Sequence, residues 1–117
     1  MFWKKKKDKF RATEVHEGNF KELVMDSEIP VVLDFWGERC TPCSVMSSIV
    51  DELAEEFDGK VRVTKVNAAM NPRLSQVFQI KGIPTFIIMK DGKAVQRFQG
   101  IVPKPNFQEI LNEYVAD

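Results

Sequence analysis

The stretch that decides the fold is residues 31–43, VVLDFWGERCTPC. Its first six residues are almost continuously apolar, a pattern typical of a strand that is buried on both faces of a sheet. Gly37 ends this strand, and an amphipathic helical pattern begins shortly afterwards at Thr41. The stretch therefore predicts a central strand that turns directly into a helix, with Cys40 at the junction.

Strand and helix signals alternate along the rest of the chain. We expect strands at residues 12–15, 31–36, 61–67, 86–89 and 94–99, and helices that begin at Asn19, Thr41, Asn71-Pro72 and Asn106. The first half of this series needs parallel crossovers and its end is an antiparallel hairpin, so the sheet should be mixed. The predicted class is an α/β fold of order βαβαββα, with helices on both faces of a central mixed sheet.

Local signals support the ends of these elements. Asn19 and Glu22 have the spacing of a capping box at the start of the first helix. Asn106 and Glu109 repeat that spacing at the start of the last helix. Asp91-Gly92 suits the type I′ turn of a β-hairpin between the last two strands.

Length and charge indicate one domain with a basic arm. The 117 residues suit a single domain, and the net charge of zero argues against a dedicated nucleic-acid binder. Six of the 17 basic side chains but only one of the 17 acidic side chains lie in residues 1–11. Residues 12–117 therefore carry eleven basic and sixteen acidic side chains. We expect a disordered basic arm at 1–11 and one folded domain at 12–117. A weak contact of this arm with an anionic partner stays open.

No targeting signal is evident. The lysine run at residues 4–7 is not followed by the apolar segment of a secretory signal, and no run reaches the roughly 18 apolar residues of a membrane span. We therefore expect a cytoplasmic protein without a membrane span.

The only two cysteines, Cys40 and Cys43, lie where the strand turns into the helix. A helix N-terminus favours the reactive thiolate through its dipole and its free N–H groups. Cys40 precedes the helix and should be exposed, whereas Cys43 lies inside the first turn and should be more buried. We expect Cys40 to attack a substrate disulfide and Cys43 to resolve the mixed disulfide. Pro42 is tolerated there because its missing N–H would be unpaired anyway.

Two other uses of the cysteine pair are weaker. A stabilising disulfide would close a very short loop, which yields only about 2 kcal/mol in the chain-entropy model. A zinc site would need two further ligands, and the only histidine, His16, lies near the first strand. We therefore expect no metal site.

Asp34 is a carboxylate inside the apolar central strand, where its burial is unfavourable unless it is paired or protonated. Lys65 is the best candidate partner, because it shares strand parity with Val61 and Val63 and so points to an apolar face. A buried Asp34 with a raised pKa would accept the proton of Cys43 when that thiol attacks. From the pattern alone, a purely structural pair with Lys65, or an exposed Asp34, stays equally open.

Ile83-Pro84 precedes a strongly apolar strand. A proline at the start of a strand suits a cis peptide bond, because no main-chain donor is needed there. The pattern alone still favours an ordinary trans turn, since few X-Pro bonds are cis.

Residues 34–43, DFWGERCTPC, followed about forty residues later by Gly82-Ile83-Pro84-Thr85, resemble the thioredoxin family. The resemblance runs from about Ala12 to the C-terminus, and the joint spacing is far more specific than a lone CxxC. It implies the thioredoxin fold, a central sheet flanked by four helices, with Pro84 in cis beside the sulfurs. The candidate catalytic residues are Cys40, Cys43, Asp34, Lys65 and Pro84.

The same resemblance implies a docking surface for a substrate peptide. Trp36 would pack under the active-site loop, and the backbone around Ile83 would line a shallow apolar groove. The candidate substrate-binding residues are Trp36, Arg39, Thr41, Pro42, Ile83, Gly100 and Ile101.

Two positions beside the cysteines depart from the family pattern. Arg39 stands where tryptophan is usual, and Thr41 where glycine is usual. The charge of Arg39 should favour the Cys40 thiolate and hence the reduced dithiol, which makes the protein a somewhat stronger oxidant. Arg39 also removes an apolar docking surface.

The resulting prediction is a thioredoxin-type protein-disulfide reductase. Its redox-active pair, Cys40 and Cys43, needs no further cofactor. Its expected partners are disulfide-containing proteins and a thioredoxin reductase, and we expect a monomer. Two alternatives stay open: a specialised or oxidising thiol oxidoreductase dedicated to one partner, and an adaptor of the same fold that does not use its thiols.

Overall fold

The computed structural model describes residues 10–115 as five strands and four helical segments. The strands are β1 (Thr13–Glu14), β2 (Val31–Trp36), β3 (Arg62–Asn67), β4 (Thr85–Lys90) and β5 (Lys93–Gln99). The helices are α1 (Thr41–Glu56), α2 (Pro72–Val77), α3 (Lys104–Asn112) and a short π-helix, η2 (Lys21–Met25). None of the helices in this described part of the chain is long and apolar enough to cross a membrane.

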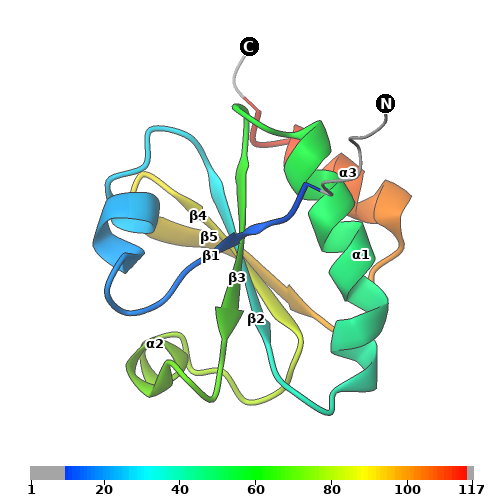
Figure 1. The fold of residues 1–117 in the computed structure, drawn as a ribbon. Helices are drawn as coiled ribbons and strands as arrows, with labels where there is room; N and C mark the ends of the chain where they lie inside the picture. The colour runs from blue at the N-terminus through cyan, green and yellow to red at the C-terminus, as the bar shows by residue number, and fades with distance from the viewer. Residues whose placement is uncertain (1–9, 116–117) are drawn as a thin grey trace, which may run out of the picture.

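The strands form one mixed sheet, as predicted (Figure 1), and their order across it is β1-β3-β2-β4-β5. β3 runs parallel to β1 and β2, whereas β4 runs antiparallel to β2 and β5. Asp91 and Gly92 turn the β4–β5 hairpin with φ of 51° and 75°, the positive values that a type I′ turn requires. Of the expected basic arm, only Phe10 and Arg11 fall within the described residues.

All five expected strands and all four expected helices are present among residues 10–115. Their order is βαβαβαββα, so the expected order βαβαββα counted one strand and one helix too few for the elements predicted. The shortest elements lie in the N-terminal part, since β1 has two residues and η2 has five. These short elements are held in place by the burial of Val15, which follows β1, and Val24 of η2 in the hydrophobic core.

Neither predicted capping box forms. The side chain of Asn19 accepts the N–H of His16 at 2.8 Å, and no side chain caps η2. α3 begins at Lys104, ahead of Asn106, with Pro105 in its first turn. Proline fixes the backbone angle that a first turn needs, so the helix begins without an asparagine cap.

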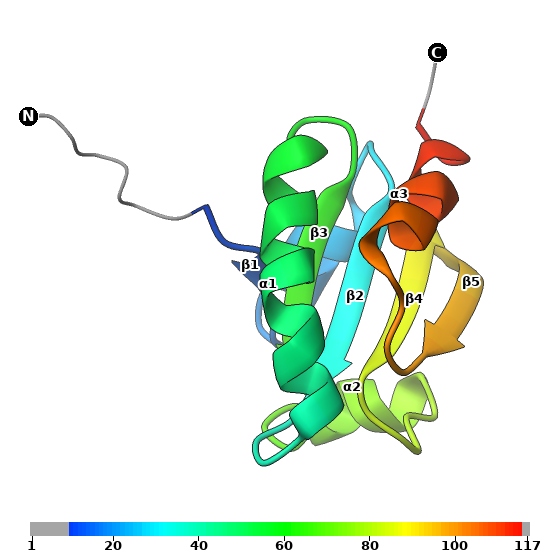
Figure 2. The ribbon, with the colours of Figure 1, turned by 90° about the vertical axis from the view of Figure 1, so that its right-hand side faces the viewer.

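The side chains of β2 alternate between two hydrophobic cores. Its odd-numbered residues pack with η2 and α2, whereas Val32 packs with α1 and α3. Because strand side chains alternate, Asp34 also faces α1. Its register partner in β3 is Lys65, on the same face. Figure 2 shows α1 and α3 lying side by side against this face of the sheet.

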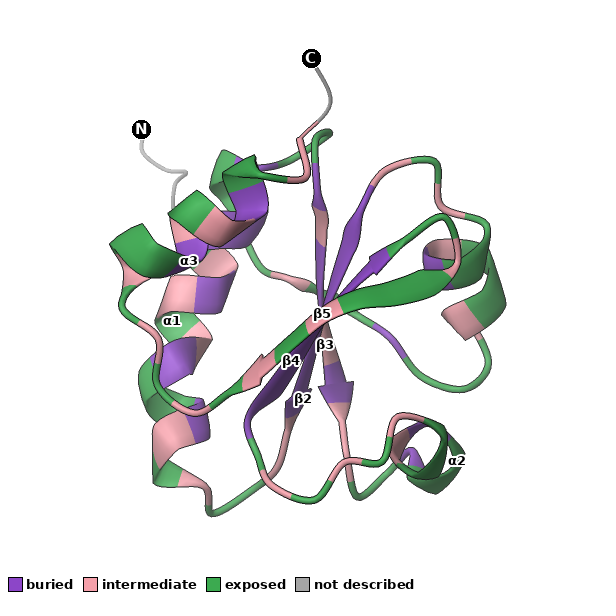
Figure 3. Cartoon of the chain, turned by 180° about the vertical axis from the view of Figure 1, so that it is seen from behind, coloured by how far each residue is buried: buried purple, intermediate pink, exposed green. Residues whose placement is uncertain are grey.

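Burial falls from the centre of the sheet to its edge. β2 and β4 are almost entirely buried, whereas most side chains of β5 are exposed (Figure 3). Phe98 of β5 is an exception that packs inward: its ring centroid lies 5.3 Å from that of Phe86 in β4 and 5.2 Å from that of Phe107 in α3. These three rings hold α3 against the sheet.

Phe107→Ala should lower the free energy of unfolding by about 3–5 kcal/mol, because it removes a fully buried ring and leaves a cavity between α3 and the sheet. Urea unfolding with the disulfide intact measures this loss. Val95→Ala, on the exposed surface of β5, is the control and should change the same quantity by less than about 0.5 kcal/mol. Similar losses in the two variants would contradict the assigned core.

Candidate active site

The two cysteines form a disulfide at the start of α1. Cys40 is the N-cap residue, and its sulfur accepts the backbone N–H of Cys43 at 3.2 Å. Cys40 is half-buried, whereas Cys43 is only 7% exposed. The unequal burial expected from the sequence is therefore present. The N–H that reaches Cys40 Sγ would also stabilise a thiolate there.

A loop before β4 lies against the first sulfur. The Ile83–Pro84 peptide bond is cis, and the carbonyl oxygen of Ile83 lies 3.8 Å from Cys40 Sγ. The Pro84 carbonyl accepts the N–H of Gly100 at 3.0 Å, which joins this loop to the end of β5. Gly37 allows the close approach, since a Cβ on it would lie 2.5 Å from Ile83 Cδ1.

The predicted substrate-binding residues surround this junction but differ in exposure. Ile83 and Ile101 present apolar side chains that are 36% and 58% exposed. Thr41 and Pro42 form the first turn of α1. Trp36 and Gly100 are half-buried.

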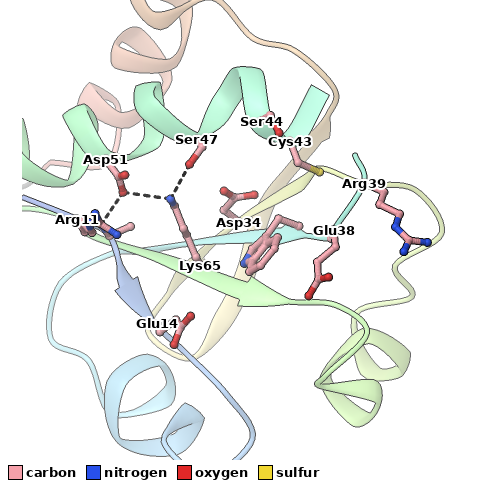
Figure 4. A pocket seen from close by; sticks show the side chains of 13 residues that line it. Arg11, Glu14, Asp34, Glu38, Arg39, Cys43, Ser44, Ser47, Asp51 and Lys65 are labelled. Carbon is pink, nitrogen blue, oxygen red and sulfur yellow. Dashed lines mark hydrogen bonds and ion pairs between the residues drawn. The ribbon is translucent and has the colours of Figure 1, made fainter. Parts of the chain in front are cut away.

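Arg39 is exposed and has an unusual backbone conformation. Its φ of 55° lies in the left-handed region, which disfavours a side chain by roughly 1–2 kcal/mol relative to the ordinary helical region. This strained residue directly precedes Cys40 and lies on the rim of a pocket beside the disulfide. Figure 4 shows the Arg39 guanidinium extending away from the sulfur of Cys43, so its charge lies at the outer side of the rim.

The pocket beside the disulfide has a volume of about 670 Å³ and reaches Asp34 (Figure 4). The Asp34 side chain comes from β2, is only 3% exposed, and its Oδ1 has no hydrogen-bond partner among residues 10–115. The pocket is lined by Arg11, Ala12, Glu14, Asp34, Trp36, Gly37, Glu38, Arg39, Cys43, Ser44, Ser47, Asp51 and Lys65. Cys43 and the buried carboxyl of Asp34 thus share one pocket.

Lys65 neighbours Asp34 as expected, but its ion pair is with another residue. Its Nζ donates to Ser47 Oγ at 3.0 Å and lies 3.2 Å from Asp51 Oδ1. Figure 4 shows the lysine side chain extending toward these two groups on α1. The suggested structural pair between Asp34 and Lys65 is therefore wrong, because α1 offers the ammonium a carboxylate and a hydroxyl. The sequence analysis did not predict Ser47 and Asp51 as site residues, although they follow Cys43 on α1 at intervals of four residues.

Burial raises the pKa of Asp34 from 3.8 to about 7. Loss of solvation is the largest cause, since it disfavours the charged form. The Lys65 charge opposes this rise, and the Asp51 charge adds to it. Asp34 consequently exchanges a proton near neutral pH.

A disulfide between two cysteines at a helix N-terminus, beside a pocket that holds a buried carboxyl, is a site for disulfide exchange, so fold and site define a thiol–disulfide oxidoreductase. The family is definite as well: a model described as Thioredoxin matches residues 11–113, and the chain belongs to the thioredoxin family. Cys40 and Cys43 are the redox-active pair of a protein-disulfide oxidoreductase.

Several relatives match over most of this chain. Thioredoxin 1 of Nostoc sp. is 38% identical over 104 residues, which cover 89% of this chain and 97% of that protein. Thioredoxin of Synechocystis sp. is 40% identical over 102 residues, covering 87% and 95%. The chloroplastic Thioredoxin M-type of Spinacia oleracea is 35% identical over 103 residues, covering 88% and 57%.

The raised pKa of Asp34 should make stability depend on pH. Because folding raises this pKa from 3.8 to about 7, the folded state binds more protons in that interval, and stability falls as the pH rises through it. The charged form then disfavours folding by roughly 4 kcal/mol. Asp34→Asn lacks this titration, so its stability relative to the parent should grow by up to roughly 4 kcal/mol between about pH 4 and pH 8.

Denaturant unfolding of the oxidised protein at a series of pH values measures this difference. Asp26→Asn is the matched control, because Asp26 is exposed and pairs with Lys21 on the surface. A stability difference for Asp34→Asn that stays constant over the whole pH range would show that Asp34 ionises normally.

Proposed function

We propose separate roles for the two cysteines in reducing protein disulfides: Cys40 attacks the substrate and Cys43 resolves the mixed disulfide. The observation that supports these roles best is the unequal burial of the sulfurs, since Cys43 is only 7% exposed and Cys40 lies at the surface end of the pair. An attacking thiolate must meet the sulfur of another protein, whereas a resolving thiol needs to reach only its neighbour.

The exchange proceeds in two balanced steps. The Cys40 thiolate attacks one sulfur of the substrate disulfide, which forms a mixed disulfide and releases the other substrate sulfur as a thiolate. Cys43 then loses its proton and attacks Cys40 Sγ, so that the Cys40–Cys43 disulfide forms and the second substrate sulfur leaves. The substrate gains the electron pair that the two cysteines lose. The N–H of Cys43, 3.2 Å from Cys40 Sγ, supports the negative charge before the first attack.

We assign the proton of Cys43 to Asp34. Both residues line one pocket, and the pKa of Asp34, about 7, lies near the working pH at which a proton acceptor is most effective. Lys65 favours the carboxylate through its charge, which opposes the effect of burial. The rim of the pocket includes exposed residues such as Glu14 and Arg39, so the pocket opens to solvent. Asp34 can pass its proton to water through this opening.

We propose that an extended substrate segment lies along the Ile83 loop. The Ile83 carbonyl lies close to Cys40 Sγ, and the exposed side chains of Ile83 and Ile101 provide apolar contacts. Pro84 would hold this loop in place. The remaining docking contacts are assigned to Trp36, Arg39, Thr41, Pro42 and Gly100.

The cellular setting is also a proposal. A thioredoxin reductase would return the disulfide to the dithiol, disulfide-containing proteins would be the substrates, and the exchange would need no cofactor beyond the cysteine pair. The family membership supports such partners in general. We propose a monomer of the cytoplasm. The Thioredoxin M-type of Spinacia oleracea is chloroplastic, and cell fractionation would distinguish the two locations.

An oxidising enzyme is the second candidate, favoured by Arg39. Its charge lies one residue from Cys40 and would stabilise the thiolate, which favours the reduced dithiol and makes the pair a stronger oxidant. Equilibration with glutathione, together with a coupled reductase assay, separates the two directions. An adaptor that ignores its thiols would keep its biological activity when both Cys40 and Cys43 are replaced by serine.

Cys40→Ser should abolish disulfide reduction, because it removes the attacking sulfur. Cys43→Ser should accumulate mixed disulfides between Cys40 and substrate, because the resolving sulfur is absent. Non-reducing gels and mass spectrometry of an insulin reaction read out both results. If Cys43→Ser traps nothing and Cys40 is the less readily alkylated thiol of the reduced protein, the roles are reversed.

Asp34→Asn should slow resolution of the mixed disulfide by about a hundredfold, the lower end of the effect of a lost proton acceptor, and leave its formation nearly unchanged. Rapid-mixing kinetics with a chromogenic disulfide resolve the two steps. Asp26→Asn is again the control. Equal slowing of both steps would contradict a specific role of Asp34 in activating Cys43.

A further inference from the structure

The wall of the pocket formed by α1 carries an ordered row of polar side chains. Cys43, Ser47 and Asp51 follow one another at four-residue intervals, so they lie on one face of the helix. All three line the pocket. Opposite them, the sheet presents Asp34 and Lys65 as register partners on neighbouring strands. The pocket therefore connects the resolving sulfur with a set of carboxyl, hydroxyl and ammonium groups.

Lys65 lies beside Asp34 in register, yet its ammonium binds α1. Nζ is 3.0 Å from Ser47 Oγ and 3.2 Å from Asp51 Oδ1. Asp34 Oδ1 has no partner in the described part of the chain. Neighbouring strands lie about 4.8 Å apart, so a lysine on the adjacent position of β3 is long enough to pair with Asp34 once α1 releases it.

We propose that Asp51, assisted by Ser47, is a positioning residue of the disulfide exchange: it holds the Lys65 ammonium against α1 and so leaves the Asp34 carboxyl able to take up and release a proton. This inference rests on the proposed role of Asp34 as the proton acceptor for Cys43. A direct pair between Lys65 and Asp34 would instead stabilise the carboxylate and make it a weaker base.

Asp51 acts on Asp34 in two ways that have the same sign. Its negative charge raises the pKa of Asp34 directly, and its ion pair keeps the opposing charge of Lys65 at a distance. Phe86, the partner of Asp34 on β4, is uncharged. Four other charged groups line the pocket: one lies in β1, one lies two residues before β1, and two lie in the loop after β2. These charged groups are Arg11, Glu14, Glu38 and Arg39.

The test is the titration of Asp34 in the oxidised protein, followed by NMR of its side-chain carboxyl carbon. In Asp51→Asn, the midpoint should fall by roughly one pH unit, because one negative charge is lost and Lys65 is released toward Asp34. The asparagine keeps an oxygen that can accept the Ala12 N–H, which Asp51 accepts at 2.9 Å. If Asp51→Asn folds poorly, Asp51→Ser removes the same charge and gives the same comparison.

A second background separates the action through Lys65 from the direct charge effect. In Lys65→Met, the further change Asp51→Asn should lower the Asp34 midpoint by less than half as much as it does in the parent, because no ammonium is released. Equal shifts in the two backgrounds, or no shift in the parent, would overturn the positioning role.

Glu52→Gln is the matched charge control. Glu52 is the next residue on α1, but it pairs with Lys104 at 2.9 Å. It should leave the Asp34 midpoint nearly unchanged, and Asp51→Glu should largely restore the parent value. A shift in Glu52→Gln as large as in Asp51→Asn would reduce the effect to general charge and refute the proposal.

The pH profile of mixed-disulfide resolution gives the functional consequence. Its midpoint should move to lower pH in Asp51→Asn together with the NMR midpoint. The NMR titration needs no turnover, so its result stands even if Cys43→Ser traps no mixed disulfide and the proposed cysteine roles fail. A shifted titration with an unshifted resolution profile would show that Asp51 does not position the reaction.

Discussion

The burial of one carboxyl group is the constraint on which the site depends. Asp34 is 3% exposed on the central strand, and its loss of solvation outweighs the attraction of Lys65, so its pKa rises to about 7. A fully apolar residue at this position would be more stable in the fold. α1 does not close over Asp34, and its polar row leaves a pocket through which the carboxyl can exchange protons. The buried Asp34 therefore lowers the stability of the fold and, in return, titrates near neutral pH beside Cys43.

The direction of β4 brings the rest of the site together. Because β4 runs antiparallel to β2, Thr85 at its start pairs with Phe35 at the end of β2. The chain after β2 leads to Cys40, and the chain before β4 contains the cis Pro84, so the two loops emerge at the same end of the sheet. A parallel β4 would have placed the Ile83 carbonyl at the opposite end, far from the sulfur that it now approaches to 3.8 Å.

The strongest sequence patterns predicted the elements that matter most. The apolar run of β2, the amphipathic α1 and the Asp-Gly hairpin all appear where expected, because burial and turn geometry act locally there. The caps of η2 and α3 failed, since Asn19 has a competing contact with His16 and Pro105 occupies the first turn of α3. The predicted pairing of Lys65 with Asp34 is wrong for another reason. The alternation of side chains along a strand predicts that both residues lie on one face of the sheet, but it does not predict that α1 brings Asp51 close to the ammonium of Lys65, which depends on tertiary packing. The four-residue spacing of Cys43, Ser47 and Asp51 could have predicted that all three lie on the same face of α1.

Cys40 is both the N-cap of α1 and a member of the redox-active pair, which has a further consequence. In the oxidised protein, the neutral Cys40 sulfur accepts the N–H of Cys43 in the first turn of α1. In the reduced protein, the acceptor becomes an anion, and a charge-assisted hydrogen bond at a helix N-terminus is the stronger of the two. The hydrogen bond that caps the first turn of α1 is therefore stronger in the reduced protein than in the oxidised protein. The reduced and oxidised forms therefore differ in the local stability of the first turn of α1, and not only in the state of their sulfurs.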